Sequence, residues 1–361
     1  MNGKFRFSGA ALLALGVCAA AGAARADDAR MRRAPQASPQ PAYHLAARYE
    51  IGGTDTAFDY LRVDADSRRL FVAHGSRVDV LDADSGARLG EVGQLASVHG
   101  IEIVPRFHMA FASSGADRTV VMFDPQSLKV VKRIKYLGDK PDALQADPAS
   151  GQLFVVNGGA TGDISILDPA TGSIVGTIDV AGGKLEEIAF DGAGRGFVND
   201  EEKSVIHVFD TRSLKPIGSW PLAPAERPRG LAIDRERHRL FAACGNRLLA
   251  VLDANTGKLL GTAPIGADPD GAAFDPKSGL VFTSNRDKTL SVVGEAAPGR
   301  FVLLQTVETG PVARTIALDE KTGRLFLPTG KLGPTPARTA AVPEPHAHLV
   351  PGTFAILVVA P

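Results

Sequence analysis

One short strand pattern returns seven times along the chain. An apolar strand, ending in Asp in most copies, recurs every 40 to 44 residues: LRVD (61–64), IEIV (101–104), LQAD (144–147), IAFD (188–191), LAID (231–234), AAFD (272–275) and IALD (316–319). A repeat of this length holds four short strands and is typical of one propeller blade. The sequence therefore predicts an all-β fold, a seven-bladed β-propeller.

The residues between two such strands complete the blade. A second apolar strand follows each first one, as in RLFVAH (69–74), and a third ends at an Asp, as in ISILD (164–168). The third strand leads into a tight turn such as Asp168 to Gly172, in which Asp caps the turn and Gly takes a positive φ. A fourth strand follows, so each unit is expected to be a four-stranded antiparallel sheet.

The seventh unit differs from the others at both ends. It stops after its third strand, whereas the strand-like segment YHLAARYEIG (43–52) precedes the first unit. We expect this N-terminal strand to complete blade seven, because a closed ring leaves no unpaired sheet edge. The unit also carries a Pro-rich insertion at 330–352, so residues 43–361 are predicted to form one domain with a long loop in blade seven.

The first 26 residues have the pattern of an export signal. Lys4 and Arg6 precede an Ala-rich apolar run, and Ala24-Arg25-Ala26 fits a cleavage site. The run is shorter than a membrane span needs. We predict a periplasmic or secreted chain, cleaved near Ala26 and without a transmembrane segment, that starts with a flexible leader at 27–42.

Charge and cysteine content narrow the possible functions. The 40 basic and 40 acidic residues balance, and removing the signal leaves a formal charge of −3. This composition disfavours nucleic-acid binding, because such binding depends on clustered positive charge. Cleavage also removes Cys18 and leaves Cys244 alone, so no intramolecular disulfide is expected. We expect a monomer.

The third unit carries a resemblance to a known family. LFVVNGGATGDISILDPATGSIVGTI (153–178) resembles the YVTN-type repeat of exported bacterial propellers, the YncE-like group, and the likeness extends over residues 43–361. Val104 in place of the usual Asp, Gly294 in the sixth unit and the 330–352 insertion depart from the pattern. The resemblance implies an exported seven-bladed propeller and no particular activity, because propellers host many functions.

Ionisable residues begin the first strand of every unit. Side chains alternate along a strand, so the residue five positions before the end of the strand shares a face with the apolar residues that follow it. These seven positions hold Asp59, His99, Asp142, Glu186, Arg229, Asp270 and Arg314. First strands lie innermost in a propeller, so we expect these side chains around one mouth of the central channel.

The second strands end on the same side of the propeller as the first strands begin. Four of their last residues are strongly polar: His74, Asn157, Asp200 and Asn285. The two sets together predict a site for a small polar ligand or for a segment of a partner protein. A solvated rim with mutual salt bridges is the alternative.

The insertion in blade seven offers a second, weaker candidate. It contains His346 and His348 beside Glu344, and imidazole with carboxylate suits a divalent metal. A Pro-rich loop with two solvated histidines fits the same residues. The sequence therefore does not identify a cofactor, and a divalent metal is one possibility.

Three functions fit these observations. The first is an exported binding or scaffold protein that acts through the channel mouth. The alternative is a lactonase-like or metal-assisted hydrolase that uses His99, Asp142, Glu186 and Arg229. Single-stranded nucleic-acid binding is the third, and 6% aromatic residues with a negative charge disfavour it.

Overall fold

The computed structural model describes residues 42–135, 138–159, 162–339 and 347–361. The predicted signal peptide and nearly all of the predicted leader lie outside the described residues. Within the described ranges, no helix is long and apolar enough to span a membrane.

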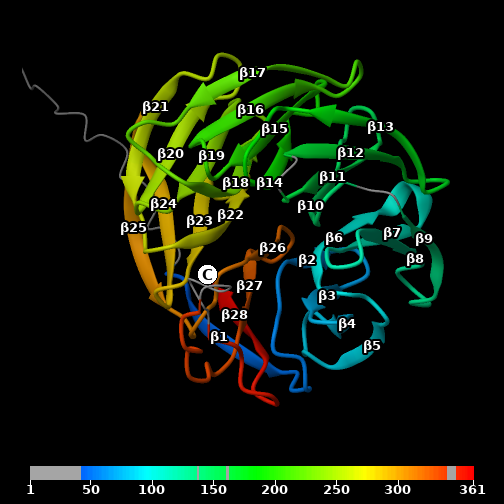
Figure 1. Ribbon diagram of the computed structural model, residues 1–361. Helices are drawn as coiled ribbons and strands as arrows, with labels where there is room; N and C mark the ends of the chain where they lie inside the picture. The colour runs from blue at the N-terminus through cyan, green and yellow to red at the C-terminus, as the bar shows by residue number, and fades with distance from the viewer. Residues whose placement is uncertain (1–41, 136–137, 160–161, 340–346) are drawn as a thin grey trace, which may run out of the picture. The chain divides into compact units, whose positions relative to one another are not determined.

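Seven four-stranded antiparallel sheets stand in a ring around a central channel (Figure 1), which confirms the predicted fold. Blade one contains β2 (Leu61–Asp64), β3 (Arg69–His74), β4 (Arg77–Asp82) and β5 (Arg88–Val92). Blade two contains β6 (Val98–Val104), β7 (Met109–Ser114), β8 (Thr119–Phe123) and β9 (Val130–Ile134). A 3₁₀ turn, η1 (Pro105–Phe107), joins β6 to β7.

The next three blades follow the same order from the axis outward. Blade three contains β10 (Pro141–Ala146), β11 (Leu153–Asn157), β12 (Asp163–Asp168) and β13 (Ser173–Asp179). Blade four contains β14 (Leu185–Phe190), β15 (Arg195–Asp200), β16 (Val205–Asp210) and β17 (Lys215–Pro221). Blade five contains β18 (Pro228–Asp234), β19 (Arg239–Cys244), β20 (Leu248–Asp253) and β21 (Leu259–Pro264).

The last two blades close the ring. Blade six contains β22 (Pro269–Asp275), β23 (Leu280–Asn285), β24 (Thr289–Ala297) and β25 (Arg300–Glu308). Blade seven contains β26 (Ala317–Asp319), β27 (Arg324–Thr329), β28 (Ala355–Ala360) and, as its outermost strand, β1 (His44–Glu50).

Strand β1 joins the two ends of the propeller, as predicted. It pairs antiparallel with β28 from His44 opposite Ala360 to Glu50 opposite Ala355. The residue before it, Tyr43, packs edge-on against Phe282 of blade six at 4.9 Å. The backbone of Tyr43 also exchanges two hydrogen bonds with the side chain of Gln305. The start of the chain therefore links blades six and seven.

A phenylalanine in each second strand packs the blades against one another. These residues are all fully or almost fully buried: Phe71, Phe111, Phe154, Phe197, Phe241, Phe282 and Phe326. Truncation of a buried Phe to Ala typically lowers the free energy of unfolding by about 3–5 kcal/mol. One such side chain per blade holds the sevenfold stack without a disulfide, and Cys244 is a free, buried thiol.

The turns behave as the sequence predicts. The Asp82 carboxylate accepts hydrogen bonds from the backbone N–H groups of Asp84 and Ser85, and Gly86 has a φ of +73°. The corresponding glycine after Asp168, Gly172, has a φ of +62°. Only glycine adopts this region without strain, so the Asp-to-Gly turn fixes the reversal between the third and fourth strands.

The insertion of blade seven leaves β27 and returns to β28 across residues 330–352, of which 340–346 lie outside the described residues. Its two described ends pair through a bridge between Leu332 and Leu349. Leu349 is buried in a cluster with Phe58 and Phe354. The base of the loop is thus anchored beside blade one.

Removing β1 tests the closure of the ring. A chain lacking residues 1–51 exposes the edge of β28 and loses the Tyr43 contacts, so we expect it to lose at least about 3 kcal/mol of unfolding free energy and to self-associate. Urea unfolding and size-exclusion chromatography measure both effects. A chain lacking only residues 1–41 is the control, and equal stability of the two chains would show that β1 does not close the fold.

Candidate functional site

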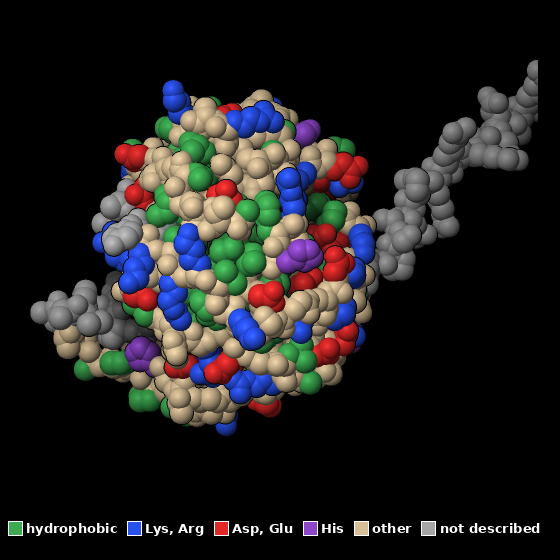
Figure 2. Space-filling model, turned by 90° about the vertical axis from the view of Figure 1, so that its right-hand side faces the viewer, with side chains coloured by type: hydrophobic (Ala, Val, Ile, Leu, Met, Phe, Trp, Pro, Cys, Tyr) green, Lys and Arg blue, Asp and Glu red, His purple; other side chains and the backbone are tan. Residues whose placement is uncertain are grey.

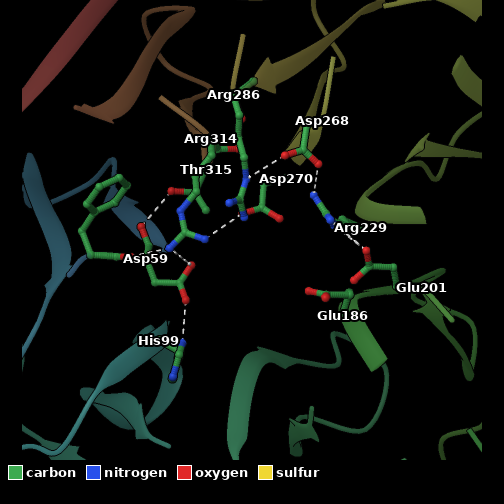
Figure 3. Close-up of polar contacts among 12 residues, drawn as sticks. Asp59, His99, Glu186, Glu201, Arg229, Asp268, Asp270, Arg286, Arg314 and Thr315 are labelled. Atoms are coloured by element: carbon green, nitrogen blue, oxygen red, sulfur yellow. Dashed lines mark hydrogen bonds and ion pairs between the residues drawn. The ribbon is translucent and has the colours of Figure 1, made fainter. Parts of the chain in front are cut away.

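The structure brings the seven ionisable residues that begin the inner strands together at one end of the channel. We call this end the ring mouth, bordered by Asp59, His99, Asp142, Glu186, Arg229, Asp270 and Arg314. Their side chains are between 10 and 24% exposed, and those drawn in Figure 3 surround its open centre. The side chains are thus recessed but accessible.

Five further charged residues connect these seven into an almost continuous series of ion pairs, which we call the charge belt. Its members alternate in sign in the order Lys140, Asp142, His99, Asp59, Arg314, Asp270, Arg286, Asp268, Arg229, Glu201, Lys184 and Glu186. Opposite charges therefore compensate each other around nearly the whole mouth, as the salt-bridged rim alternative predicts.

His99 lies between two carboxylates. Its Nδ1 is 2.6 Å from Asp59 Oδ2 and 3.7 Å from Asp142 Oδ1. Burial alone would lower the pKa of His99, but the hydrogen bond to Asp59 and the charges of Asp142 and Asp59 outweigh it and raise that pKa. The imidazolium form is thus favoured at this position.

Arg314 joins blade seven to blades six and one. Its guanidinium is 3.0 Å from Asp270 and 3.8 Å from Asp59, and it donates to the Phe58 carbonyl at 2.7 Å. The same group lies 5.2 Å from the ring centre of Phe58, a cation–π distance. Burial raises the pKa of the Asp59 carboxyl, but Arg314 and His99 together hold it below its usual range.

Two members of the charge belt occupy a position that holds glycine in the other five blades. The residue after the second strand is glycine in five blades: Gly75, Gly115, Gly158, Gly245 and Gly330. A Cβ at Gly115 would lie 2.8 Å from the His99 ring, so this position borders the mouth. Blades four and six place Glu201 and Arg286 there, and these bind Arg229 and Asp270.

The belt is open at one point. Glu186 pairs with Lys184 at 2.5 Å, and in the described part of the chain no ion pair joins Glu186 to the other end of the belt at Lys140 and Asp142. Burial raises the pKa of Glu186 to about 8, Lys184 opposes this, and the negative charges of Asp270 and Asp142 add to it. Two carboxyl groups thus face a sector of the mouth without a fixed cation between them.

Sequence reasoning missed the belt residues that lie outside the inner strands. Lys140, Lys184 and Asp268 stand two positions before ring residues, and residues i and i+2 of an extended chain share a face. This spacing is a usable signal. Glu201 and Arg286 could have been found as charged residues at a glycine position of the repeat.

The second predicted set does not lie at the mouth. His74, Asn157, Asp200 and Asn285 are completely buried, so the structure does not support their placement in a ligand site. Each bonds to the third strand of its own blade: His74 to Asp79 at 2.7 Å, Asn157 to Ser165 at 3.0 Å, Asp200 to His207 at 2.9 Å and Asn285 to Ser291 at 3.0 Å. These pairs satisfy polar groups inside the blades.

A cavity inside the channel lies beyond the ring mouth. It has a volume of about 330 Å³ and begins one residue after the ring, at positions such as Gly100 and Ala143. It continues to Ala65, Arg235 and Glu320 near the opposite face, and no ring residue lines it. The ring mouth and the cavity are therefore two separate places on one axis.

Tyr60 stands between the ring mouth and the cavity. It belongs to blade one, yet it packs against the core cluster of blades three and four that contains Ala143 and Ile188. A side chain from blade one reaches these blades only by crossing the axis. Burial and the nearby carboxylates of Glu187 and Asp142 raise the pKa of its hydroxyl well above the usual value.

Glu187 places a carboxyl group in the cavity wall. Its Oε2 accepts a hydrogen bond from the Leu231 backbone N–H at 2.7 Å. Burial raises its pKa to about 8, although that hydrogen bond and Arg62 act in the opposite direction. At neutral pH the cavity therefore contains a carboxyl group that is largely protonated.

The structure describes one of the two metal candidates of the insertion. His346 lies outside the described residues, and His348 is exposed. Among the described residues, the His and carboxylate group whose ligand atoms converge is Asp59, His99 and Asp142, with all three atoms within 4.8 Å of one another. The thiol of Cys244 is unsuited to metal or nucleophilic chemistry, because burial raises its pKa to about 12.

The outer wall seen in Figure 2 carries Lys, Arg, Asp and Glu side chains interspersed, without a broad area of one sign on this face. A nucleic-acid groove needs clustered positive charge and aromatic platforms. This face does not supply such a groove.

Comparisons with known proteins agree on the fold. No family model matches the chain, and no curated protein matches it. A solved structure of Kuenenia stuttgartiensis hydrazine synthase is similar, with 15% identity, a TM-score of 0.66 and coverage of 76% of this chain and 92% of that one. The WD40 propeller domain of Doa1 (12% identity, TM-score 0.66, 88% and 97% coverage) and the RRP9 WD40 repeats (11%, 0.70, 88% and 100%) are also similar. At these identities the likeness shows a β-propeller fold alone.

Replacing Asn157 tests the structural role of the buried set. Asn157→Ala removes hydrogen bonds to Asp163 and Ser165 inside blade three, so we expect a loss of about 1–3 kcal/mol of unfolding free energy. Urea unfolding measures this loss. A change below about 0.5 kcal/mol would instead agree with a free, functional side chain.

Replacing Glu187 tests the protonated carboxyl in the cavity. The folded pKa is about 8 and the unfolded pKa about 4.5, so the folded state binds more protons between these values and loses stability as pH rises through them. Glu187→Gln is expected to be more stable than the native chain by about 1–3 kcal/mol at pH 9 and nearly equal to it at pH 4. Urea unfolding at both pH values measures the difference, with the exposed Glu236→Gln as control. An equal difference at both pH values would contradict the raised pKa.

Proposed function

We propose that this chain is an exported, non-catalytic binding protein of the YVTN (YncE-like) type that holds a small polar ligand at the ring mouth. The N-terminal pattern and the repeat support export and family, and the propeller fold suits a rigid binding scaffold. A charged segment of a partner protein would use the same groups.

The opening in the charge belt carries the proposal. Around most of the mouth each charge already has a partner, so a ligand there would have to break existing ion pairs. The carboxyl groups of Glu186 and Asp142 border this opening. Glu186 is paired with the half-exposed Lys184, and Asp142 is paired with the half-exposed Lys140 at 3.1 Å and with His99 at 3.7 Å. A ligand that enters this sector displaces water and flexible lysines rather than buried partners.

The chemistry of the opening favours a ligand that bears an ammonium group. Such a group supplies a cation between Glu186 and Asp142, extends the alternation of the belt and favours the ionised form of Glu186, whose pKa of about 8 otherwise leaves it largely protonated at neutral pH. Hydrogen bonds between charged partners are about twice as strong as neutral ones. The lysines released from the carboxylates are then available to a carboxylate of the same molecule, so amino acids and related zwitterions fit best.

A hydrolase is the second candidate, and one observation favours it. Glu186, with a pKa of about 8, can exchange a proton near neutral pH, as a general acid or base must. Hydrolysis of lactone or ester substrates, lost in Glu186→Gln, would support this candidate.

A thermal-shift screen tests the binding proposal. Amino acids, polyamines and amino sugars are added one at a time at millimolar concentration to the native chain, to Glu186→Gln and to the control Glu236→Gln. At 100 times its dissociation constant, a ligand stabilises the fold by about 2.7 kcal/mol, which raises the melting temperature by roughly 5 °C. We expect such a shift for an ammonium-bearing compound with the native chain and the control, and its loss in Glu186→Gln. An undiminished shift in Glu186→Gln, or no shift with any compound, contradicts the proposal.

A further inference from the structure

The second feature of the ring mouth lies on the other side of the opening from Glu186, where three potential metal ligands converge. Asp59, His99 and Asp142 come from the inner-strand starts of three successive blades. His99 Nδ1 is 2.6 Å from Asp59 Oδ2 and 3.7 Å from Asp142 Oδ1. Ligand atoms on one zinc ion lie about 3.0–3.5 Å apart, given metal–ligand distances of about 2.1 Å. The two carboxylate oxygens lie within 4.8 Å of each other, so side-chain rotations that move these atoms by up to about 1.3 Å would give all three atoms that spacing.

The other polar atoms of these residues are held from outside. Asp59 turns Oδ1 toward Arg314 at 3.8 Å, and Asp142 turns Oδ2 toward Lys140 at 3.1 Å. The remaining ring nitrogen of His99, Nε2, is 3.2 Å from the Ser97 hydroxyl. Metal-binding histidines and carboxylates are oriented in this way by partners on their second polar atoms. The three atoms that remain are those that face one another.

Glycines keep the space around this group clear of side chains. A Cβ at Gly115 would lie 2.8 Å from the His99 ring, and one at Gly158 would lie 3.0 Å from Asp142 Oδ2. The three side chains are nevertheless only 11–16% exposed. An ion held here would be recessed, with its remaining coordination positions directed toward the mouth.

Charge agrees with the geometry. The belt requires a cation between Asp59 and Asp142, and in the structure the His99 imidazole occupies that place. A metal ion bound by neutral imidazole puts a cation at the same point and leaves the order of charges in the belt unchanged. No other ion pair of the belt has to be broken.

We propose that Asp59, His99 and Asp142 form a binding site for one divalent first-row transition metal ion. One imidazole nitrogen and two carboxylate oxygens suit Zn²⁺, Mn²⁺ or Co²⁺ better than Ca²⁺ or Mg²⁺, which prefer ligand sets made of oxygen alone. Three protein ligands leave at least one coordination position for water or for a bound molecule. The site shares Asp142 with the proposed ligand position but does not require Glu186.

A metal titration of the full chain tests this site. The protein is purified without a histidine tag, stripped with a chelator and titrated with Co²⁺, whose visible absorption reports protein ligands, followed by competition with Zn²⁺. We expect one equivalent to bind. His99→Gln and Asp142→Asn are expected to weaken binding by at least about 100-fold. His44→Gln, an exposed histidine on β1, is the matched control and should bind as the native chain does.

Each outcome decides the proposal. No binding by the native chain, or binding that survives His99→Gln, overturns it, and loss of binding in His348→Gln would move the site to the insertion. Circular dichroism of the stripped variants shows whether they fold. If His99→Gln does not fold, metal binding by Asp142→Asn and the ¹⁵N resonances of His99 in the native chain, with and without Zn²⁺, show whether these residues bind the metal. Glu186→Gln should keep the metal, so failure of the proposed ligand site leaves this result unaffected.

Discussion

The pairing of β1 with β28 is the interaction on which the rest of the structure depends. It turns seven sheets into a closed ring, and closure makes every inner strand begin at the same end of the axis. Residues as far apart in sequence as Asp59 and Arg314 then lie 3.8 Å apart. The charge belt therefore depends on closure, because every blade contributes at least one residue to it and no blade contains enough charges to form it alone.

Repetition made much of this predictable from the sequence. The second strand at 69–74 has the predicted bounds, because its apolar run is short and ends at turn residues. The ionisable position at or just before the start of each inner strand could be predicted, because all seven copies place it at the same distance from the end of the strand. A single blade would have shown only a polar strand end.

The buried residues at the ends of the second strands show that strand alternation alone does not decide whether a polar side chain faces the channel mouth or the interior of its blade. His74, Asn157, Asp200 and Asn285 each have a polar residue at the second position of the third-strand motif. Ser114, Cys244 and Thr329 have Val121, Ala250 and Leu357 at the equivalent position. This matched pattern was present in the sequence and indicates internal pairs rather than a mouth. The loop-borne members of the belt and the crossing of the axis by Tyr60 depend on side-chain directions, which strand periodicity does not fix.

The central claim is that charges from remote blades form one coupled belt at the ring mouth. A double-mutant cycle on Asp270→Asn and Arg314→Met, whose side chains belong to blades six and seven and lie 3.0 Å apart, measures this coupling as a free energy of unfolding. The account predicts a coupling of about 0.5–3 kcal/mol. Additive effects of the two substitutions would show that the two charges do not interact, and the belt would not exist as described.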